Sequence, residues 1–301
     1  MRLLLVVSAM VLTSACSKGG TPTSPSPQPT PAPPAPTVPA VVTVTATITN
    51  TVSGAIIGSS VQTVTSLPAQ LTIAQAGYVT RQTWVSSAEP RIDLFPDAGF
   101  DLGFFRAFAR DAFARPLAVQ PLRLQTRAPM IYLRTVDTLG AAVDPLTLNL
   151  AADAIASVVP QFNGGRFGIV GLERGTGDRT GQTGWITVRW IAPVEQGLCG
   201  RAQVGGTYID LNYLLSACSC GGAKIEAGTV KHEIGHAMGF YHTGDGQDLM
   251  VGLSQVRPCD RNPSQRERHH AALAYTRLPG NTDVDVDPRV PSAFQTMMVV
   301  D

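Results

Sequence analysis

The sequence predicts an α+β fold in which a mixed sheet with a histidine-bearing helix follows a small β-sandwich module. Residues 41–97 hold short segments rich in β-branched residues that alternate with period two, which is typical of half-buried strands. Residues 129–280 mix strand-like segments with segments of helical periodicity. Within the second region, two histidines four residues apart share one face of a predicted helix.

The composition excludes several classes of protein. The chain has 301 residues, of which 44% are hydrophobic and 15% charged, with 23 basic and 22 acidic side chains. Because the charges nearly cancel, the sequence indicates no nucleic-acid partner and no basic membrane-binding face. No uninterrupted apolar stretch reaches 18 residues, so no bilayer-spanning helix is predicted.

Residues 1–16 are typical of an export signal. Arg2 precedes an apolar run from Leu3 to Leu12, and small residues lead to Cys16. This end resembles the lipobox of bacterial lipoproteins, in which the cysteine is lipidated. The resemblance implies a membrane anchor on Cys16 and a cell-envelope location, with the outer membrane favoured by the following Ser17. The alternative is a cleaved signal, an unmodified cysteine and a secreted protein.

Residues 17–40 are rich in Pro, Thr and Ser, which predicts a disordered linker because proline lacks an N–H donor and fixes φ. Residues 41–97 follow as the β-sandwich module. The strands expected there are 42–48, 61–64, 70–73, 78–85 and 91–95. The module resembles carboxypeptidase regulatory-like and PEGA-type domains. We expect it to act as a spacer or adhesion domain, with glycan binding as the alternative.

Residues 98–128 form a connecting segment, in which the aromatic-rich stretch 100–113 predicts a short helix packed between domains. The region 129–280 then has the order β-α-β-β-β-β-α. The expected strands are 130–135, 166–171, 185–191, 199–204 and 207–211, with helices at 146–159 and 226–238.

The pattern H-E-x-x-H-x-x-G-x-x-H spans residues 232–242. His232 and His236 lie on one helix face, and Glu233 projects beside them where it can reach a metal-activated water. Gly239 can leave the helix through a left-handed conformation and return His242 as a third ligand. Three neutral imidazoles and one open position suit a catalytic zinc ion.

This pattern resembles the metzincin zinc metallopeptidases, over roughly residues 129–280. The resemblance implies a zincin fold and a methionine turn beneath the metal, which Met250 matches as an apolar floor and not as a ligand. Thr243 after the third histidine is similar to the matrixin branch. In that family an extended peptide substrate pairs with the edge strand of the sheet, for which Ala202–Val204 is the best match.

The chain departs from animal matrixins in two respects. All five histidines lie at or after position 232, so the histidines of a second, structural zinc site are absent. No cysteine lies between Cys16 and Cys199, so the upstream cysteine that keeps those enzymes latent is also absent.

Four further cysteines predict two disulfides in an exported domain. They are Cys199, Cys218, Cys220 and Cys259. Cys218 and Cys220 are too close to pair with each other, so each bonds either Cys199 or Cys259, which leaves two connectivities. A zinc knot that uses all four thiolates is the alternative.

A helix with a capping box is expected at 264–277, where Ser264 precedes Glu267 by three residues. His269 and His270 on it are expected to be packed or solvated, without a metal. Residues 281–301 are expected to form a solvated tail. Its alternating acidic residues lack the glycine and distal glutamate of a calcium loop, so calcium has no support.

The expected activity is that of a zinc-dependent endopeptidase acting on extracellular or envelope proteins, with Glu233 as the general base. One alternative is a non-catalytic surface adhesin whose metalloprotease-like domain only binds. A metal-dependent hydrolase acting on a non-peptide bond stays open as well. The sequence predicts neither the cleavage preference, which depends on loops such as 252–259, nor the oligomeric state.

Overall fold

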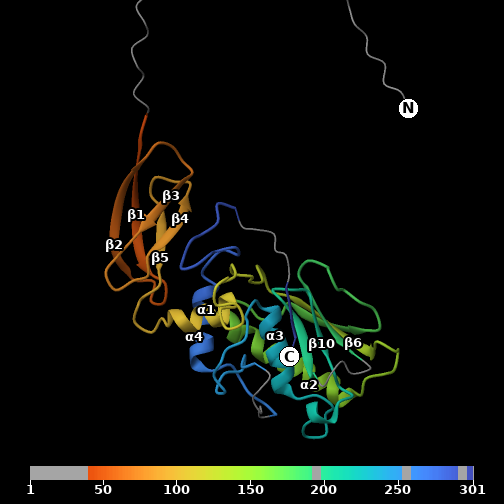
Figure 1. Ribbon diagram of the computed structural model, residues 1–301. Coiled ribbons are helices and arrows are strands. Elements are labelled where there is room, and N and C mark those ends of the chain that lie inside the picture. Colours follow the sequence, from red (N-terminus) through yellow and green to blue (C-terminus); the bar gives the residue numbers. More distant parts are fainter. Residues whose placement is uncertain (1–39, 192–197, 253–258, 291–296, 301) are drawn as a thin grey trace, which may run out of the picture. The chain divides into compact units, whose positions relative to one another are not determined.

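A computed structural model describes residues 40–191, 198–252, 259–290 and 297–300 (Figure 1). The expected export signal with Cys16, nearly all of the proline-rich linker and the middle of the loop at 252–259 lie outside these ranges. Among the helices within them, none combines the length and apolar character needed to cross a bilayer. The α+β class is confirmed, because four α-helices accompany both parallel and antiparallel strands in the described part of the chain.

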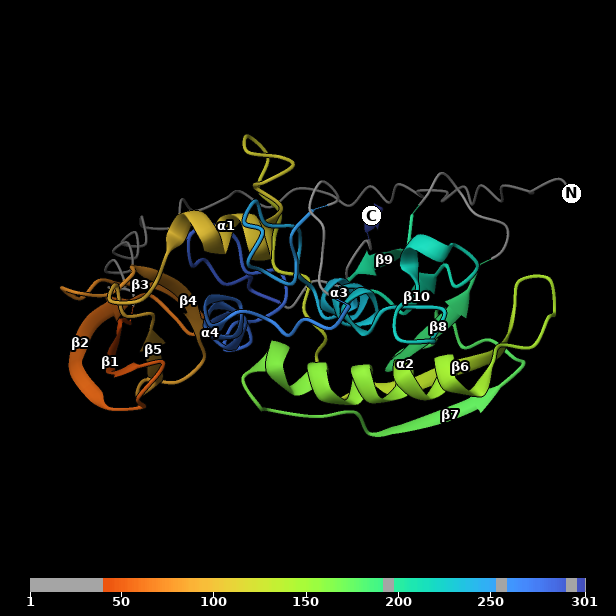
Figure 2. The same cartoon turned by 90° about the horizontal axis from the view of Figure 1, so that it is seen from below.

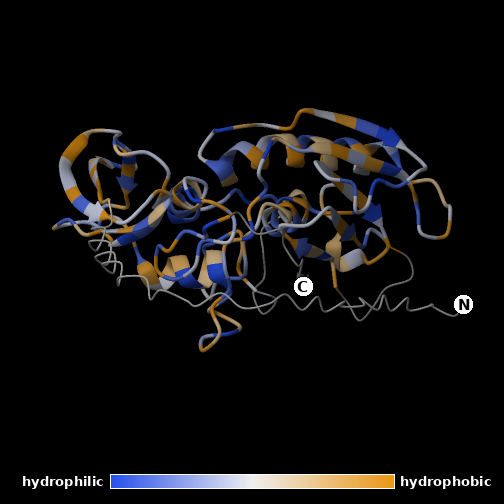
Figure 3. Ribbon diagram, turned by 90° about the horizontal axis from the view of Figure 1, so that it is seen from above, coloured by the Kyte–Doolittle hydropathy of each residue, from blue (hydrophilic) through white to orange (hydrophobic). Residues whose placement is uncertain are grey.

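Five strands form two small sheets at the beginning of the described chain. They are β1 (Val42–Asn50), β2 (Ile56–Val64), β3 (Ala69–Ile73), β4 (Arg81–Val85) and β5 (Arg91–Leu94). One sheet has the order β2-β1-β5 and the other pairs β3 with β4. Alternate residues such as Val44, Ala46 and Ile48 point into a core shared with β3, β4 and β5. The same alternation gives bands of contrasting hydropathy along these strands (Figure 3).

Buried ion pairs bind this module to the rest of the protein. On the module side, Arg81 and Asp93 lie on β4 and β5. Arg277 donates to Asp93 and to the buried Asp285, while Arg81 donates to Asp93 and to the buried Asp287. Because these charged groups lose their hydration on folding, their burial is tolerated only while every ion-pair partner stays in place. The module is therefore fixed to the C-terminal part of the chain through this charge cluster.

The expectation of a solvated tail after residue 280 is wrong at two of the acidic positions and at Met297–Val300, which form a strand of the larger sheet. Asp285 is 1% exposed and Asp287 is 3% exposed, and both accept hydrogen bonds from the Asn281 amide. Asp283 is partly exposed and pairs with Arg106. Asp285 and Asp287 serve as partners for the buried Arg277 and Arg81, a role that their spacing alone could not indicate.

A six-stranded sheet forms the second half of the molecule, in the order β11-β9-β10-β8-β6-β7. Its strands are β6 (Met130–Asp137), β7 (Gly171–Gly175), β8 (Trp185–Trp190), β9 (Gly200–Val204), β10 (Tyr208–Leu211) and β11 (Met297–Val300). Strands β7, β6, β8 and β10 run parallel, whereas β9 is antiparallel to both β10 and β11. Strand β8 lies in the interior of the sheet, and four of its six residues are buried.

Helices α2 (Pro145–Val158) and α3 (Ala227–Ala237) pack against this sheet and against each other (Figure 2). Asp144 caps α2, and Pro145 at the first helical position needs no hydrogen-bond partner. The core between the layers includes Ile131, Ile155 and Ile234. The order β6-α2-β7-β8-β9-β10-α3 matches the expected one, with two short 3₁₀ turns, Val159–Asn163 and Ser216–Cys218, between these elements.

Two further helices complete the fold. The helix α1 (Leu102–Arg110) begins at the N-cap Asp101 and buries its phenylalanines. The helix α4 (Gln265–Ala274) begins with the predicted capping box of Ser264 and Glu267. Helices α1 and α4 contact each other, so the short helix expected within the connecting segment is part of the packed structure.

Two strand predictions are corrected. The strand expected at 166–171 begins only at Gly171, because residues 163–169 form a turn in which the Asn163 side chain bonds the backbone of Phe167. The strand expected at the sheet edge, around Ala202–Val204, is β9, but it is not an edge. Strand β11 pairs with its outer side.

The charge cluster makes a prediction for Asp93→Asn. Burial alone would raise the pKa of Asp93, but the Arg277 and Arg81 guanidiniums lower it to about 2. A lowered pKa stabilises the fold above the unfolded value near 4, and this contribution is lost as the pH falls toward 2. We expect Asp93→Asn to cost about 1–2 kcal/mol at pH 7, after allowance for the partial exposure of Asp93.

Urea unfolding at several pH values measures this difference, which should narrow between pH 5 and pH 2. Glu173→Gln is the matched control, because Glu173 pairs with Arg179 at 3.8 Å on the exposed surface. It should cost less than about 0.5 kcal/mol. Equal effects of the two variants at pH 7 would contradict the assigned role of the cluster.

Candidate metal centre

The helix α3 carries His232 and His236 on its buried face. Their spacing of four residues places both rings over one turn of the helix, and both side chains are completely buried. The Nε2 atoms of the two rings lie 3.1 Å apart. The helix backbone therefore fixes the distance between the two rings.

Gly239 ends this helix and returns the chain to the same site. Its φ is +111°, and a Cβ at this position would lie 2.9 Å from the backbone carbon of Arg123. A side chain is thus excluded by both conformation and space. After the turn, the Phe240 ring stacks on Phe108 of α1 at 4.3 Å, and the Tyr241 N–H donates to the Phe108 carbonyl. The helix α1 thereby supports the path that leads to His242.

His242 reaches the other two histidines. Its Nε2 lies 3.2 Å from Nε2 of His236, and the three candidate ligand atoms are all within 4.8 Å of one another. His242 is half-buried, whereas the other two rings are fully buried. In the described part of the chain this is the one group of three or more histidine, cysteine or acidic side chains arranged to hold a metal ion.

Backbone carbonyls orient two of the rings from behind. Nδ1 of His232 lies 2.6 Å from the Leu249 carbonyl oxygen, and Nδ1 of His236 lies 2.7 Å from that of Phe240. A carbonyl oxygen only accepts, so each Nδ1 carries the hydrogen and each Nε2 presents its lone pair inward. Hydrogen bonds of this kind fix the orientation and tautomer of metal-binding histidines.

Met250 packs directly behind the histidine helix. A Cβ at Gly235 would lie 2.9 Å from the ring of Phe162 and closer still to the Met250 sulfur. The glycine between the two histidine turns therefore admits the methionine side chain. Met250 is fully buried and its sulfur contacts the helix between the two histidines.

Glu267 holds the turn that carries Met250, a role beyond its expected capping box. Its carboxylate accepts hydrogen bonds from the N–H groups of Leu249, Met250 and Ser264. Burial raises the pKa of Glu267 to about 7, although these three donors act in the opposite direction. Since the Leu249 carbonyl contacts the His232 ring, Glu267 supports this ring indirectly, through the backbone of Leu249. Only the long-range contact between α4 and the turn could have indicated this role.

Asp248 is a second support that sequence reasoning did not identify. Its buried carboxylate accepts from the Thr243 and Ser264 hydroxyls and from the Arg266 guanidinium. Thr243 follows the third histidine directly, and its N–H donates to the Met250 carbonyl. The segment after His242 and the turn before Met250 are therefore bonded to each other and to α4.

Glu233 is fully buried on the same helix, next to His232. Strand β9 approaches it so closely that a Cβ at Gly200 would lie 2.7 Å from both Cγ and Cδ of Glu233. Gly200 thus leaves the space that this carboxylate occupies. The sequence offered no local signal for this contact, because Gly200 lies 33 positions before Glu233.

Two disulfides brace this region, as predicted. Cys199 bonds Cys218, and Cys220 bonds Cys259, which selects one of the two connectivities left open by the sequence. The first links the start of β9 to the segment before α3. The second links that segment to the chain after the Met250 turn, where the Cys259 carbonyl also accepts from the Gly228 N–H. Disulfides of this kind are typical of an oxidising, extracytoplasmic environment.

The remaining histidines lie on α4, away from this group. His270 is buried, its Nε2 accepts from the Asp101 N–H, and its Nδ1 lies 2.8 Å from the Arg266 carbonyl oxygen. The Nε2 contact joins α4 to the N-cap of α1, and the Nδ1 contact fixes the ring on its own helix. His269 is half-buried beside it. Their expected structural role agrees with these contacts.

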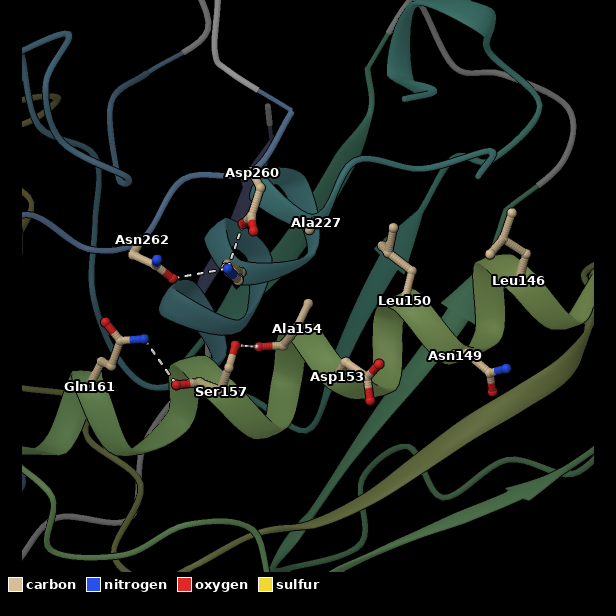
Figure 4. A pocket seen from close by; sticks show the side chains of 11 residues that line it. Leu146, Asn149, Leu150, Asp153, Ala154, Ser157, Gln161, Ala227, Asp260 and Asn262 are labelled. Atoms are coloured by element: carbon tan, nitrogen blue, oxygen red, sulfur yellow. Dashed lines mark hydrogen bonds and ion pairs between the residues drawn. The ribbon is translucent and has the colours of Figure 1, made fainter. Parts of the chain in front are cut away.

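A separate pocket of about 670 Å³ lies between α2 and the beginning of α3 (Figure 4). Lys231 reaches this pocket and donates to Asp260 and Asn262. Lys231 and its neighbour His232 therefore lie on different faces of the same helix. The lysine anchors the back of α3 and contributes nothing to the histidine group.

No protein-family model matches this chain, and no curated protein shows significant similarity to it. The interpretation of the site therefore depends on its own geometry.

We expect the protein to bind one divalent transition-metal ion through this group, since imidazole nitrogens suit such ions. Zinc is the probe, with metal content and thermal unfolding as the measurements. Zinc should raise the melting temperature of the wild type, because a ligand that binds only the folded state stabilises it. His236→Ala should abolish both the binding of zinc and the zinc-dependent rise in melting temperature. His269→Ala is the matched control and should retain them, and stoichiometric zinc in His236→Ala would contradict the assignment.

Proposed function

We propose that this protein is a zinc-dependent endopeptidase. The observation that carries the proposal is the convergence of three histidine Nε2 atoms near a buried glutamate. Two of the histidines and the glutamate lie on α3, and the third histidine follows the turn at Gly239. A general base next to a three-histidine site is what hydrolysis by an activated water requires.

The donor set fits zinc. Tetrahedral coordination at 2.0–2.1 Å separates neighbouring ligand nitrogens by about 3.3 Å. The measured separations of 3.1 and 3.2 Å from His236 to the other two histidines agree with this value. Three nitrogen ligands leave a fourth position open, as in catalytic and not in structural zinc sites. When bound, the ion would supply a Lewis acid that acidifies water and polarises a peptide carbonyl.

Residues of the chain itself would carry out proton transfer and hold the metal ion. Glu233 accepts the proton of the attacking water and transfers it to the nitrogen of the leaving amine. Its burial beside Gly200 limits the rotamers available to the carboxylate and so keeps it directed at the reacting groups. His232, His236 and His242 would supply only neutral nitrogens, so a bound divalent ion would keep its positive charge to stabilise a developing oxyanion.

The finer family assignment is part of this proposal. A metzincin fold of the matrixin branch accounts for the third histidine after Gly239 and for Met250 behind the helix. We also propose that the first five strands form a β-sandwich module. A lipid anchor on Cys16 and a proline-rich tether would place the enzyme at the cell envelope. Its substrates would then be extracellular or envelope proteins.

Glu233→Gln tests the mechanism. The amide cannot accept the proton of water, so cleavage of casein should fall by about 10²–10⁴-fold while zinc content is unchanged. Chelation should abolish wild-type cleavage, and added zinc should restore it. Cleavage by Glu233→Gln at the wild-type rate would refute the assigned base. Absence of any chelator-sensitive cleavage by folded, zinc-loaded wild type would favour a binding protein instead.

Gly200→Ala tests the positioning of Glu233. The added methyl group must displace the carboxylate, because their atoms would lie 2.7 Å or less apart. We expect kcat to fall by about 10²-fold with KM and zinc content unchanged, since small displacements of a catalytic group have effects of this size. Ala202→Gly on the same strand is the matched control and should leave kcat within a few-fold. Equal kcat values for Gly200→Ala and the wild type would show that Glu233 is not constrained by β9.

A further inference from the structure

Strand β9 runs alongside the candidate metal centre. At its beginning, Gly200 abuts the Glu233 carboxylate, and just beyond its end the Gly205 N–H donates to the His236 carbonyl at 2.9 Å. Strand β9 also contacts α3 directly (Figure 2). Any peptide paired with the side of β9 that faces away from β10 would therefore run past Glu233 and the helix turn that carries His236.

That side of β9 is already occupied by the chain itself. Strand β11 pairs with β9 in antiparallel register, in which Met297 faces Val204 and Val300 faces Arg201. The other side of β9 pairs with β10. Strand β11 approaches from the His236 end, and its last described residue lies one register position short of Gly200. The segment thus has the direction and position of a peptide lying along the site.

Strand pairing of this kind is exclusive. An extended peptide that adds to a sheet edge uses the edge strand's outward N–H and C=O groups as its hydrogen-bond partners. Strand β11 uses the same groups over Arg201–Val204. A peptide substrate and β11 cannot pair with β9 at the same time.

We propose that the segment Met297–Val300 is an intramolecular inhibitor that occupies the peptide-binding edge of β9 and must leave before a substrate binds. This proposal rests on the proposed peptidase function for its consequence, but the competition for β9 itself concerns binding alone. The ligand class is an extended peptide held mainly through its backbone.

The inhibitor is suited to displacement and not to permanent blockade. It has four residues, and short edge strands are weakly held by themselves. Covalent attachment gives such a segment an effective concentration of about millimolar at β9. If it occupies β9 for about nine-tenths of the time, the apparent KM for a substrate rises about ten-fold.

The test compares two double variants of the full chain. Met298→Pro with Val299→Pro removes both adjacent N–H groups, so whichever one faces β9 is lost. Met298→Ala with Val299→Ala is the matched control, because it truncates the same two side chains but keeps the backbone donors. Each pair is made in the wild type and in the Glu233→Gln background.

Peptide binding is measured in the zinc-loaded Glu233→Gln background, where no cleavage interferes. The probe is a fluorescent peptide with the sequence of residues 296–301. We expect the proline variant to bind it about ten-fold more tightly than the alanine variant. Hydrogen exchange of the β9 amides, measured without peptide, should be faster in the proline variant. In the active background, the proline variant should show a lower KM and an unchanged kcat.

Equal peptide affinity and equal β9 exchange in the two variants would overturn the proposal. If the proline variant failed to fold, zinc content and melting temperature would reveal it, and the peptide added to wild-type enzyme would then provide the test. Competitive inhibition by the added peptide supports the shared site, and absence of inhibition at millimolar peptide overturns it. Tighter peptide binding without cleavage by any variant would support the inhibitor and refute the peptidase function.

Discussion

Three imidazole nitrogens held within 4.8 Å of one another are the constraint on which this structure depends. In the absence of a cation, nothing attracts these lone pairs to each other, so the protein must hold each ring from outside. Helix geometry does this for His232 and His236, and the glycine turn at 239 does it for His242. Around them, carbonyl acceptors, the Met250 side chain and the carboxylate of Glu267 remove the remaining freedom.

The support of the site comes from parts of the chain that are far away in sequence. Phe108 on α1 stacks on the residue after Gly239, and α4 anchors the turn that carries Met250. The helices α1 and α4 are in turn bound to each other through His270. Beyond them, Arg277 links α4 to the first five strands. The N-terminal module is therefore part of the same packed body as the site, although it contributes no candidate ligand.

Much of this arrangement could be predicted from the sequence where a local rule applied. Strand alternation located the first five strands, and the histidine spacing with Gly239 located all three candidate ligands. The cysteine spacing limited the disulfides to two connectivities. These inferences succeeded because each depends on geometry within one element or on one short spacing.

The remaining features depend on contacts between distant segments. The acidic residues at 285 and 287 looked solvated, because nothing nearby in sequence reveals the arginines that bury them. Gly200 showed no local sign of its contact with Glu233. Strand β11 could not be foreseen either, since pairing with β9 is set by tertiary position. Sequence reasoning thus recovered the donors of the site and missed what holds and covers them.

The disulfide between Cys220 and Cys259 has a consequence for where the protein matures. It closes a loop around α3 and the Met250 turn, so the two walls behind the histidines are joined covalently. A chain that folds where thiols stay reduced lacks this closure and holds the same walls by packing alone. The final rigidity of the histidine group is therefore acquired only when Cys220 and Cys259 are oxidised.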